Sequence, residues 1–560
     1  MKHTRTLIVF AALAGLATAA HAQSELQPRS SGTTQSMPAQ ALPVPALPSP
    51  VAEQPKSQLQ VLIEDSIAKY VDRKPEREAV AAFYQARNYK PIWTSDADAR
   101  ARAAAAIAYL QNVAGEGLDP REYPTPAIKD SMDEAQAAAG ELQLTGSVLR
   151  YARHASNGRV SYTRVSNSIL YPEHAIDPAK VLEQVSSTRK VGDVLASYEP
   201  QQPEFKKLKV ALARERSGDA TLDPAQNDRS GRGRFRHESD RARAEAVNTI
   251  IANMERWRWL PRDLGRDHVV VNIPDFTLAV FKDGRPVWST KIVDGKPGRT
   301  ATPLLSETMK YLTINPTWNV PPSIIRNEYL PALENDPDAL ERIGLKVGYN
   351  SDGSLRVYQP PGARNALGRI RFNFPNQFLV YQHDTPDKQL FARDNRALSH
   401  GCMRVQNPEK YAEVLLSLSQ PEDNYSIDRI RSMYGSEERT INLKNPIPVQ
   451  ITYQTAFVDD KGNLQFRHDI YGLDAAVLKL MRGNERSIAD IPVARHRDSS
   501  SKPVMARIPA NRDYQQPYQQ NDFFWNDRGW QNRSYEERSY GEHQYYRRSE
   551  GPFGRAFSLW

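Results

Sequence analysis

The 560-residue chain contains a single cysteine, Cys402. One cysteine excludes an internal disulfide framework, a cysteine-rich zinc site and an iron–sulfur cluster. After the N-terminal segment no apolar run reaches about 18 residues, which excludes a polytopic membrane protein. The chain also lacks a large excess of charge of one sign, because its 74 Lys and Arg residues nearly balance its 66 Asp and Glu residues. The small positive excess permits contact with anionic surfaces but does not single out nucleic acid.

Hydrophobic residues make up only 39% of the chain, and 40 residues are proline. Both values predict that parts of the chain do not fold. Residues 23–56 are rich in Pro, Ser, Gln and Ala, and we expect a disordered tether there. Residues 481–560 interleave aromatic residues with Arg, Gln and Asn, and we expect a disordered tail. Such a composition can bind single-stranded nucleic acid, but an exported protein is not expected to meet that partner.

The N-terminus has the pattern of a secretory signal. Lys2 and Arg5 precede an apolar run over residues 7–20, and Ala20-His21-Ala22 follows it. A basic start, a short apolar stretch and small residues at the exit predict a signal peptide over residues 1–22, cleaved after Ala22. An uncleaved anchor is the alternative, although the run is short for a bilayer span. We therefore expect an exported chain that works in the periplasm in association with the cell wall.

The remaining sequence divides into a helical part, a linker and a β-rich part. Residues 57–215 have helical spacing of apolar side chains and predict an all-helical domain. Residues 216–246 crowd arginine into a Gly, Ser and Asp background and predict a solvated linker. From residue 247 to 480 the pattern becomes β-rich, and Asn407-Pro408 predicts the start of a helix. The expected strands are His268–Ile273, Thr277–Phe281, Pro286–Val293, Tyr311–Ile314 and Phe378–Tyr381, with a late hairpin over Pro448–Phe466.

The candidate chemistry lies between His383 and Asn407. A thiol nucleophile must become a thiolate, and a histidine within hydrogen-bond reach can accept its proton. His383 closes a predicted strand, and the following loop can bring Cys402 back beside it. Gly401 allows close approach of the backbone, so amides near the thiol can form an oxyanion hole. Arg404 can favour the thiolate or hold a substrate carboxylate.

Three other interpretations use the same residues. A cysteine peptidase uses a thiol–imidazole pair, but peptidases of that kind acting on the wall usually place Cys before His. A zinc site could use His383, His400 and Cys402, with Asp384 as an oxygen ligand. The third interpretation is a non-catalytic envelope scaffold, in which the helical domain, linker and tail are the functional parts.

The segment Ser399-His400-Gly401-Cys402-Met403-Arg404, with His383 upstream, resembles the signature of the L,D-transpeptidases with a YkuD-type catalytic domain. Segments elsewhere resemble the large periplasmic branch of that family, and these are Asn272-Ile273-Pro274, residues 315–321, residues 361–368, Phe374-Pro375-Asn376 and residues 381–386. The helical region resembles the scaffold domain of that branch around Phe83-Tyr84, Pro91-Ile92-Trp93 and residues 117–120. The likeness covers roughly residues 60–210 and 247–480.

The resemblance implies a multidomain α+β protein. An N-terminal all-helical scaffold domain would precede a β-rich, sandwich-like catalytic domain over residues 247–480, with a lid near 321–367. Cys402 would attack the diaminopimelate–D-Ala bond of a peptidoglycan tetrapeptide, His383 would serve as general base and acid, and Gly401 would contribute to the oxyanion hole. The expected substrate-binding residues are Tyr381, Ser399, His400, Arg404, Asn407 and Trp318.

The resemblance also implies the products and the partners. An amine acceptor would resolve the thioester and give a 3→3 cross-link. Family members also attach outer-membrane proteins to the wall or hydrolyse such links, and carbapenems typically acylate the same cysteine. No metal or organic cofactor is implied.

One departure concerns wall binding. Members of this branch often carry a peptidoglycan-binding module between the scaffold and catalytic domains, and this chain has the Arg-rich linker in its place. We therefore expect the linker or the aromatic tail to supply wall contact, a hypothesis that rests on position and charge.

Overall fold

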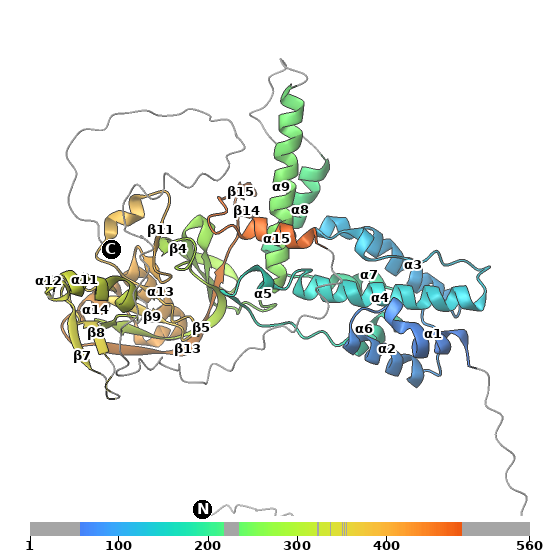
Figure 1. Ribbon diagram of the computed structural model, residues 1–560, viewed down its shortest axis with the longest axis horizontal. Helices are drawn as coiled ribbons and strands as arrows, with labels where there is room; N and C mark the ends of the chain where they lie inside the picture. Colours follow the sequence, from blue (N-terminus) through green and yellow to red (C-terminus); the bar gives the residue numbers. More distant parts are fainter. Residues whose placement is uncertain are drawn as a thin grey trace, which may run out of the picture. The chain divides into compact units, whose positions relative to one another are not determined.

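The computed structural model describes residues 56–217 and 234–483, apart from Pro322, Ser323, Pro337, Asn350, Asp352 and Ser354 (Figure 1). The predicted signal peptide, nearly all of the tether, residues 218–233 of the linker and the tail beyond residue 483 lie outside the described residues. Among the helices within those ranges, none combines the length and the apolar character needed to cross a membrane.

The first part is helical, as the sequence predicts. Its elements are α1 (Gln58–Ser66), α2 (Lys74–Ala86), α3 (Ala97–Gln111), α4 (Glu134–Asn157), α5 (Tyr162–Val165), α6 (Pro178–Ser186), α7 (Val191–Ala196) and α8 (Pro203–Ser217). Helix α4 begins at a capping box formed by Asp133 and Gln136. Its buried Glu141 accepts hydrogen bonds from the Tyr84 hydroxyl at 2.8 Å and from the Trp93 amide at 3.0 Å. These bonds fasten α2 and the segment after it to the central helix.

Helix α9 (Arg234–Trp259) differs from the sequence prediction. Residues 234–246 were expected to be linker, and residue 247 was expected to begin the β-rich part. Instead Ile250, Met254 and Trp257, which are spaced four and three residues apart, are buried on one face of the helix. The helical spacing of these apolar side chains outweighs the arginine-rich start of the segment.

The β-rich part is built on one large sheet. Its strands are β2 (His268–Asn272), β3 (Thr277–Lys282), β4 (Arg285–Gly295), β5 (Leu304–Ile314), β9 (Ile370–Asn373), β10 (Gln382–His383), β11 (Ala397–Ser399), β12 (Met403–Val405) and β13 (Arg439–Thr452), joined by β1 (Ile169–Leu170) from the helical part. The strand order is β1-β5-β13-β2-β3-β4-β12-β10-β9, with β11 beside β4. Strand β9 also pairs with β5, so the sheet closes on itself. Closure removes most free edges and leaves the interior for apolar side chains.

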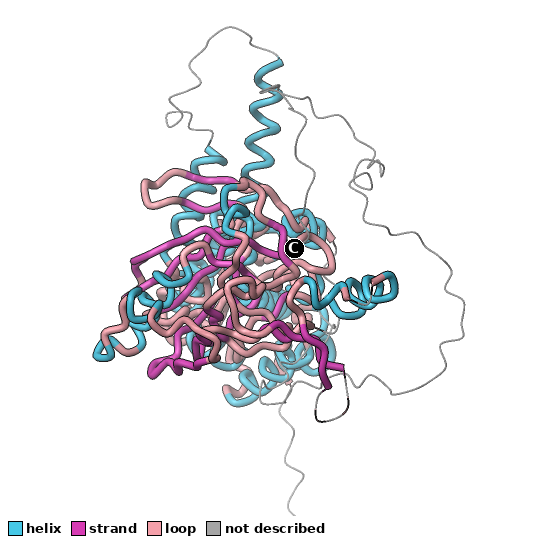
Figure 2. The backbone as a smooth tube through the Cα atoms, turned by 90° about the vertical axis from the view of Figure 1, so that its left-hand side faces the viewer, coloured by secondary structure: helices cyan, strands magenta, loops and turns pink. Residues whose placement is uncertain are grey.

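Helix α13 (Pro408–Ser419) begins where Asn407-Pro408 predicts, and α14 (Ile427–Arg431) follows it. Tyr411 on α13 is fully buried, and its hydroxyl donates to Gln382 Oε1 at 2.7 Å. This hydrogen bond joins α13 to β10, the strand that carries His383. Figure 2 shows the strands and the helices in different colours.

Two predicted strands take other forms. Residues 376–379 form a turn and residues 379–381 lie outside any strand. Asn376 Oδ1 accepts from the Phe378 amide at 3.1 Å and its Nδ2 donates to the Val380 carbonyl at 2.7 Å, which stabilises the turn. Leu379 consequently adopts a positive φ of 57°. The late hairpin is confined to β14 (Ala456–Val458) and β15 (Leu464–Phe466), while the residues before it belong to β13 of the main sheet. Helix α15 (Leu473–Met481) completes the described chain.

Residues 318–367 form a small subdomain with its own apolar cluster. It contains β6 (Trp318–Asn319), β7 (Lys346–Tyr349), β8 (Leu355–Gln359), α11 (Leu330–Asn335) and α12 (Ala339–Arg342). The three strands pair in the order β6-β8-β7. Tyr381 packs against its buried cluster, which includes Trp318 and Leu367. The predicted lid therefore corresponds to a compact unit that reaches the strand end at His383.

Candidate active site

His383 is placed between two arginine-bearing strands. Its Cα partner on β9 is Arg371, and its Cα partner on β12 is Arg404. The Met403 amide donates to the Tyr381 carbonyl at 3.0 Å. Because Cys402 directly precedes Met403, this register brings the thiol to the end of β10 beside Tyr381. The structure thus brings together the two residues that the sequence pairs, His383 and Cys402.

A main-chain contact sets the tautomer of His383. Its Nδ1 lies 2.5 Å from the carbonyl oxygen of Asp384. A carbonyl oxygen can only accept, so Nδ1 carries the proton and donates it. Nε2 is then the basic nitrogen, as a general base for a thiol requires.

The surroundings keep the imidazole neutral. The pKa of His383 is lowered to about 3, chiefly by burial and also by the positive charges of Arg404 and Arg371, while the hydrogen bond to the Asp384 carbonyl acts to raise it. The His383 residue is 5% exposed. At neutral pH the ring is therefore an unprotonated acceptor.

The thiol is neutral for the same reason. Burial raises the pKa of Cys402 to about 11, while its interactions with Tyr381 and the charges of Arg371 and Arg404 act to lower it. Cys402 keeps partial exposure as a residue. A neutral thiol beside a neutral imidazole means that proton transfer accompanies nucleophilic attack, and that no thiolate–imidazolium pair is stored beforehand.

The loop before the thiol is held by internal hydrogen bonds. Gly401 has a φ of 110°, a conformation that favours glycine. Its amide donates to Ser399 Oγ at 3.1 Å, and that hydroxyl donates to the Cys402 carbonyl at 2.6 Å. The Gly401 amide is therefore engaged within the loop, and Ser399 braces that loop. The oxyanion role of the Gly401 backbone and the contact of Ser399 with substrate stay predictions.

A second layer supports the same loop. Thr302 Oγ1 donates to the Gly401 carbonyl at 2.9 Å and accepts from the Gly295 amide at 2.9 Å. The Tyr471 hydroxyl donates to the Gly295 carbonyl at 2.6 Å and accepts from the Thr302 amide at 3.2 Å. A Cβ on Gly295 would lie 1.9 Å from the Thr300 carbonyl and 3.0 Å from Gly401 Cα. Close backbone packing therefore fixes the position of the segment that presents Cys402.

The Asp384 side chain anchors the other half of the site. Its carboxylate accepts from the Arg369 amide at 2.8 Å, from the Thr385 amide at 2.7 Å and from Lys388 Nζ at 2.6 Å. A Cβ on Gly368, whose φ is 60°, would lie 2.2 Å from that carboxylate. The bonds hold the peptide unit whose carbonyl orients His383. Asp384 thus has a positioning role here, where the zinc interpretation used it as a ligand.

The other predicted site residues fall into two groups. Tyr381 and Trp318 lie at the site, since Tyr381 interacts with both Cys402 and Trp318 and its ring meets that of His383 edge to face at 5.7 Å. Arg404 also belongs there, and its Nη1 donates to Asp387 Oδ2 at 2.9 Å. His400 and Asn407 are exposed.

The Asn407 side chain donates to Thr290 Oγ1 at 3.3 Å and does not cap α13. In the described part of the chain, no three His, Cys, Asp or Glu side chains are arranged to hold a metal ion.

Sequence reasoning missed Arg371, Thr302, Tyr471 and Asp294. Arg371 carries a detectable signal, because it alternates with the buried Ile370 and Phe372 along β9. Asp294 carries none, although it is fully buried and neither carboxyl oxygen has a hydrogen-bond partner among the described residues. Burial raises the pKa of Asp294 well above its usual range, against the opposing charge of Arg396.

Two family models and one curated protein match parts of the chain. Residues 266–451 match the family model described as the L,D-transpeptidase catalytic domain, and residues 78–212 match that of a scaffold domain. A curated relative from Haemophilus influenzae, named "Putative L,D-transpeptidase", is 30% identical over 245 residues, which cover 41% of this chain and 48% of the relative. The chain therefore matches about half the length of that relative.

The solved structures that match part of the chain include the following two L,D-transpeptidases. One, from Mycobacterium smegmatis, is 15% identical, with a TM-score of 0.18, over 33% of this chain and 58% of that chain. The other is the catalytic domain of the E. faecium enzyme, 17% identical, with a TM-score of 0.17, over 33% of this chain and 96% of that chain.

Proposed function

The chain carries an L,D-transpeptidase catalytic domain preceded by a scaffold domain, and on that premise we propose that it cross-links peptidoglycan through an acyl-enzyme on Cys402. The observation that carries the proposal is the hydrogen bond from His383 Nδ1 to the Asp384 carbonyl at 2.5 Å. That bond leaves Nε2 basic on the strand next to the only thiol of the chain.

The first half-reaction acylates the cysteine. His383 Nε2 accepts the thiol proton as sulfur attacks the carbonyl carbon of diaminopimelate in a tetrapeptide donor. A tetrahedral intermediate forms, and its oxyanion would be met by main-chain amides at Cys402, since the Gly401 amide is already engaged. His383 then gives its proton to the leaving amine, the C–N bond breaks, and D-Ala departs from the thioester.

The second half-reaction transfers the acyl group. An acceptor amine attacks the thioester carbon and His383 takes a proton from that amine. The C–S bond then breaks, and His383 returns the proton to the sulfur of Cys402, which restores the thiol. With a diaminopimelate side-chain amine as acceptor the product is a 3→3 cross-link. With water the product is a tripeptide, and with an amine of an outer-membrane protein it is a wall-linked protein. These acceptors share one donor step, so the residues around Cys402 serve all three.

The lid subdomain offers a way to exclude water from the site. Trp318 is 7% exposed and Tyr381 packs on the apolar cluster of the lid. A donor peptide must reach Cys402 past these side chains, so opening of the lid precedes acylation, and closure excludes water that would hydrolyse the thioester. The predicted export and periplasmic location fit a substrate that lies outside the cytoplasm.

Product analysis tests the proposal. The chain without its predicted signal peptide is incubated with a disaccharide-tetrapeptide, and the products are separated by chromatography and identified by mass. We expect 3→3 dimers and free D-Ala, both absent with Cys402→Ala. Tripeptide alone indicates carboxypeptidase action, and no product from the native chain supports the non-catalytic scaffold interpretation.

A further inference from the structure

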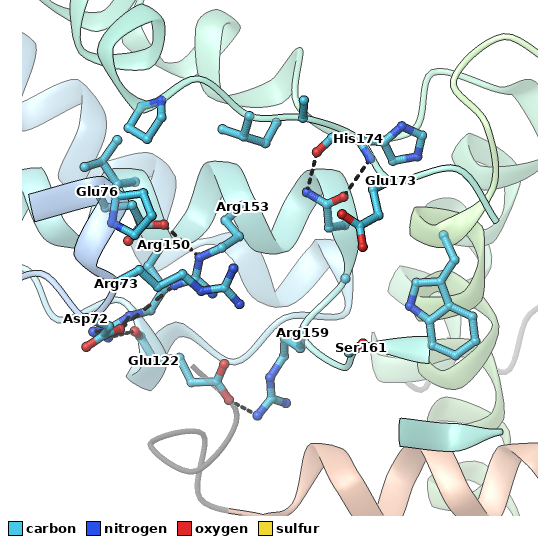
Figure 3. A pocket seen from close by; sticks show the side chains of 18 of the residues that line it. Asp72, Arg73, Glu76, Glu122, Arg150, Arg153, Arg159, Ser161, Glu173 and His174 are labelled. Atoms are coloured by element: carbon cyan, nitrogen blue, oxygen red, sulfur yellow. Dashed lines mark hydrogen bonds and ion pairs between the residues drawn. The ribbon is translucent and has the colours of Figure 1, made fainter. Parts of the chain in front are cut away.

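A cavity of about 1060 Å³ lies in the helical part of the chain, and none of its lining residues belongs to the site around Cys402. Its walls come from the segment between α1 and α2, from residues 121–124, from the second half of α4 and the residues after it, and from residues 172–178 (Figure 3). Small-ligand sites in proteins commonly enclose about 300–1,000 Å³. The cavity is therefore large enough for a peptide of several residues.

Charged side chains dominate its lining. Five arginines line it, and four of them come from α4 and from the segments just before α2 and just after α4: Arg73 precedes α2, Arg150 and Arg153 lie one turn apart on α4, and Arg159 follows the end of α4. Figure 3 shows Arg73, Arg150 and Arg153 close to one another near Asp72 and Glu76, with Arg159 apart from them beside Glu122. In all, six basic and four acidic residues line the cavity. The basic residues are Lys69, Arg73, Arg121, Arg150, Arg153 and Arg159, and the acidic residues are Asp72, Glu76, Glu122 and Glu173.

The carboxylates hold the arginines in place. Arg150 Nη2 lies 2.6 Å from Asp72 Oδ2, and Arg153 Nε lies 2.9 Å from Glu76 Oε1. Arg159 pairs with Glu122. Each guanidinium has five N–H donors. Arg150 uses all three of its nitrogens within the protein, on the Asp72 carboxylate and on the Glu122 carbonyl, whereas the ion pair of Arg153 with Glu76 uses Nε. The ion pair pre-orients the other donors of Arg153, which lowers the entropic cost of binding a further carboxylate.

The positive charge of the cluster is not cancelled by its acidic neighbours. Six basic side chains line the cavity against four acidic ones, which leaves an excess of positive charge. His154 lies on α4, as Arg150 and Arg153 do, and is buried. Burial lowers the pKa of His154 well below its usual range, and the charges of Arg153, Arg159, Arg150 and Arg73 act in the same direction.

We infer that this cavity is a second binding site, which holds a carboxylate-bearing peptide of the wall polymer while the catalytic domain acts on another. The identity of the polymer rests on the proposed function. A peptide fits better than a phosphate group because both charge signs line the cavity. Stem-peptide carboxylates would contact Arg73 and Arg153, and a free amine would contact Glu173. A phosphate group, in contrast, would be repelled by the acidic residues.

Hydrogen exchange of the full chain tests the inference. The chain carries Cys402→Ala so that bound peptide is not turned over, and the probe is a disaccharide-tetrapeptide. We expect protection of residues 69–76 and 149–161, and separately of residues 381–404. In Arg73→Gln/Arg153→Gln the first protection is lost and affinity at that site falls by about tenfold or more. The matched control is Arg100→Gln/Arg189→Gln, which removes exposed ion pairs with Asp130 and Asp98 outside the cavity.

The outcomes separate the two sites. Protection of residues 149–161 that survives in the double variant, or equal protection by inorganic phosphate alone, overturns the inference. Protection of residues 149–161 without any at 381–404 keeps the inference and contradicts the proposed function. If circular dichroism shows that the double variant is unfolded, the Cys402→Ala chain decides, because absence of peptide protection at 149–161 overturns the inference by itself.

Discussion

The hydroxyl of Thr302 donates to the carbonyl of Gly401 at 2.9 Å, one residue before the nucleophile. The same hydroxyl accepts from the Gly295 amide, so one side chain joins the end of β4 to the loop that presents Cys402. Both main-chain partners are buried, and neither reaches water if the hydroxyl is removed. The position of the thiol relative to His383 thus depends on a residue that does not take part in the chemistry.

Thr302→Val should lower both stability and turnover. The variant keeps the shape of the side chain but leaves a buried amide and a buried carbonyl unpaired, which costs about 1–3 kcal/mol. We expect a lower urea midpoint and a lower kcat. Thr302→Ser restores the hydroxyl and should recover most of both. Native turnover in the valine variant would show that the bond does not position Cys402.

Gly295→Ala should abolish turnover. The added Cβ would lie 1.9 Å from the Thr300 carbonyl and 2.8 Å from the Thr302 amide, so backbone must move and the neighbouring Gly401 moves with it. The matched control is Gly362→Ala, where no atom lies within 4 Å of the new Cβ. Steady-state rates of the two variants provide the comparison. Equal activity of both would mean that the approach of β4 to the thiol loop is not required.

Alkylation of the single thiol should reveal a neutral resting pair. Because the pKa of Cys402 is raised to about 11 and that of His383 is lowered to about 3, neither group is charged at pH 7. The rate with iodoacetamide should therefore rise about tenfold per pH unit from pH 6 to pH 9. Cys402→Ala serves as the blank. A rate that is flat over this range would indicate a thiolate already paired with protonated His383.

Asp294→Asn should stabilise the protein at alkaline pH. Burial raises the pKa of Asp294, so above about pH 4 the native state keeps a proton that the unfolded chain releases. Native protein then binds more protons than unfolded protein, and the free energy of unfolding falls as pH rises through that region. The amide does not titrate, and we expect a gain of about 1–3 kcal/mol at pH 8 in urea unfolding.

The control for that comparison is Asp283→Asn, because the Asp283 side chain is 60% exposed in the turn after β3. It should leave the pH dependence of unfolding unchanged. A loss of stability at pH 8 in Asp294→Asn would contradict the assignment of a protonated, buried carboxyl.

Local sequence patterns predicted those parts of the fold in which one periodicity dominates. The strand at His268 and the helix after Asn407-Pro408 begin where predicted. Residues 247–259 were predicted to belong to the β-rich part, because the preceding arginine-rich segment was interpreted as a linker. Ile250 and Met254 nevertheless have helical spacing, and these residues belong to α9. Residues 378–381 have strand composition, but the side chain of Asn376 stabilises a turn that depends on precise geometry.

The same contrast holds for the site. The pairing of His383 with Cys402 followed from residue types and a family signature. The contribution of Arg371 depends on the register of β9 against β10, and that of Thr302 depends on a contact across 99 residues of sequence. No local pattern encodes such long-range contacts. The engaged amide of Gly401 belongs to the same class, because it depends on the rotamer of Ser399.

Mass analysis of the acylated protein tests the central claim most directly. The chain is mixed with a disaccharide-tetrapeptide in the absence of an acceptor amine, quenched in acid and digested, and the peptide that contains Cys402 is examined. We expect a tripeptide-bearing thioester on Cys402 in the native chain, slow formation of that adduct in His383→Gln, and none in Cys402→Ala. An adduct on another residue, or cross-linked product formed by Cys402→Ala, would contradict the account.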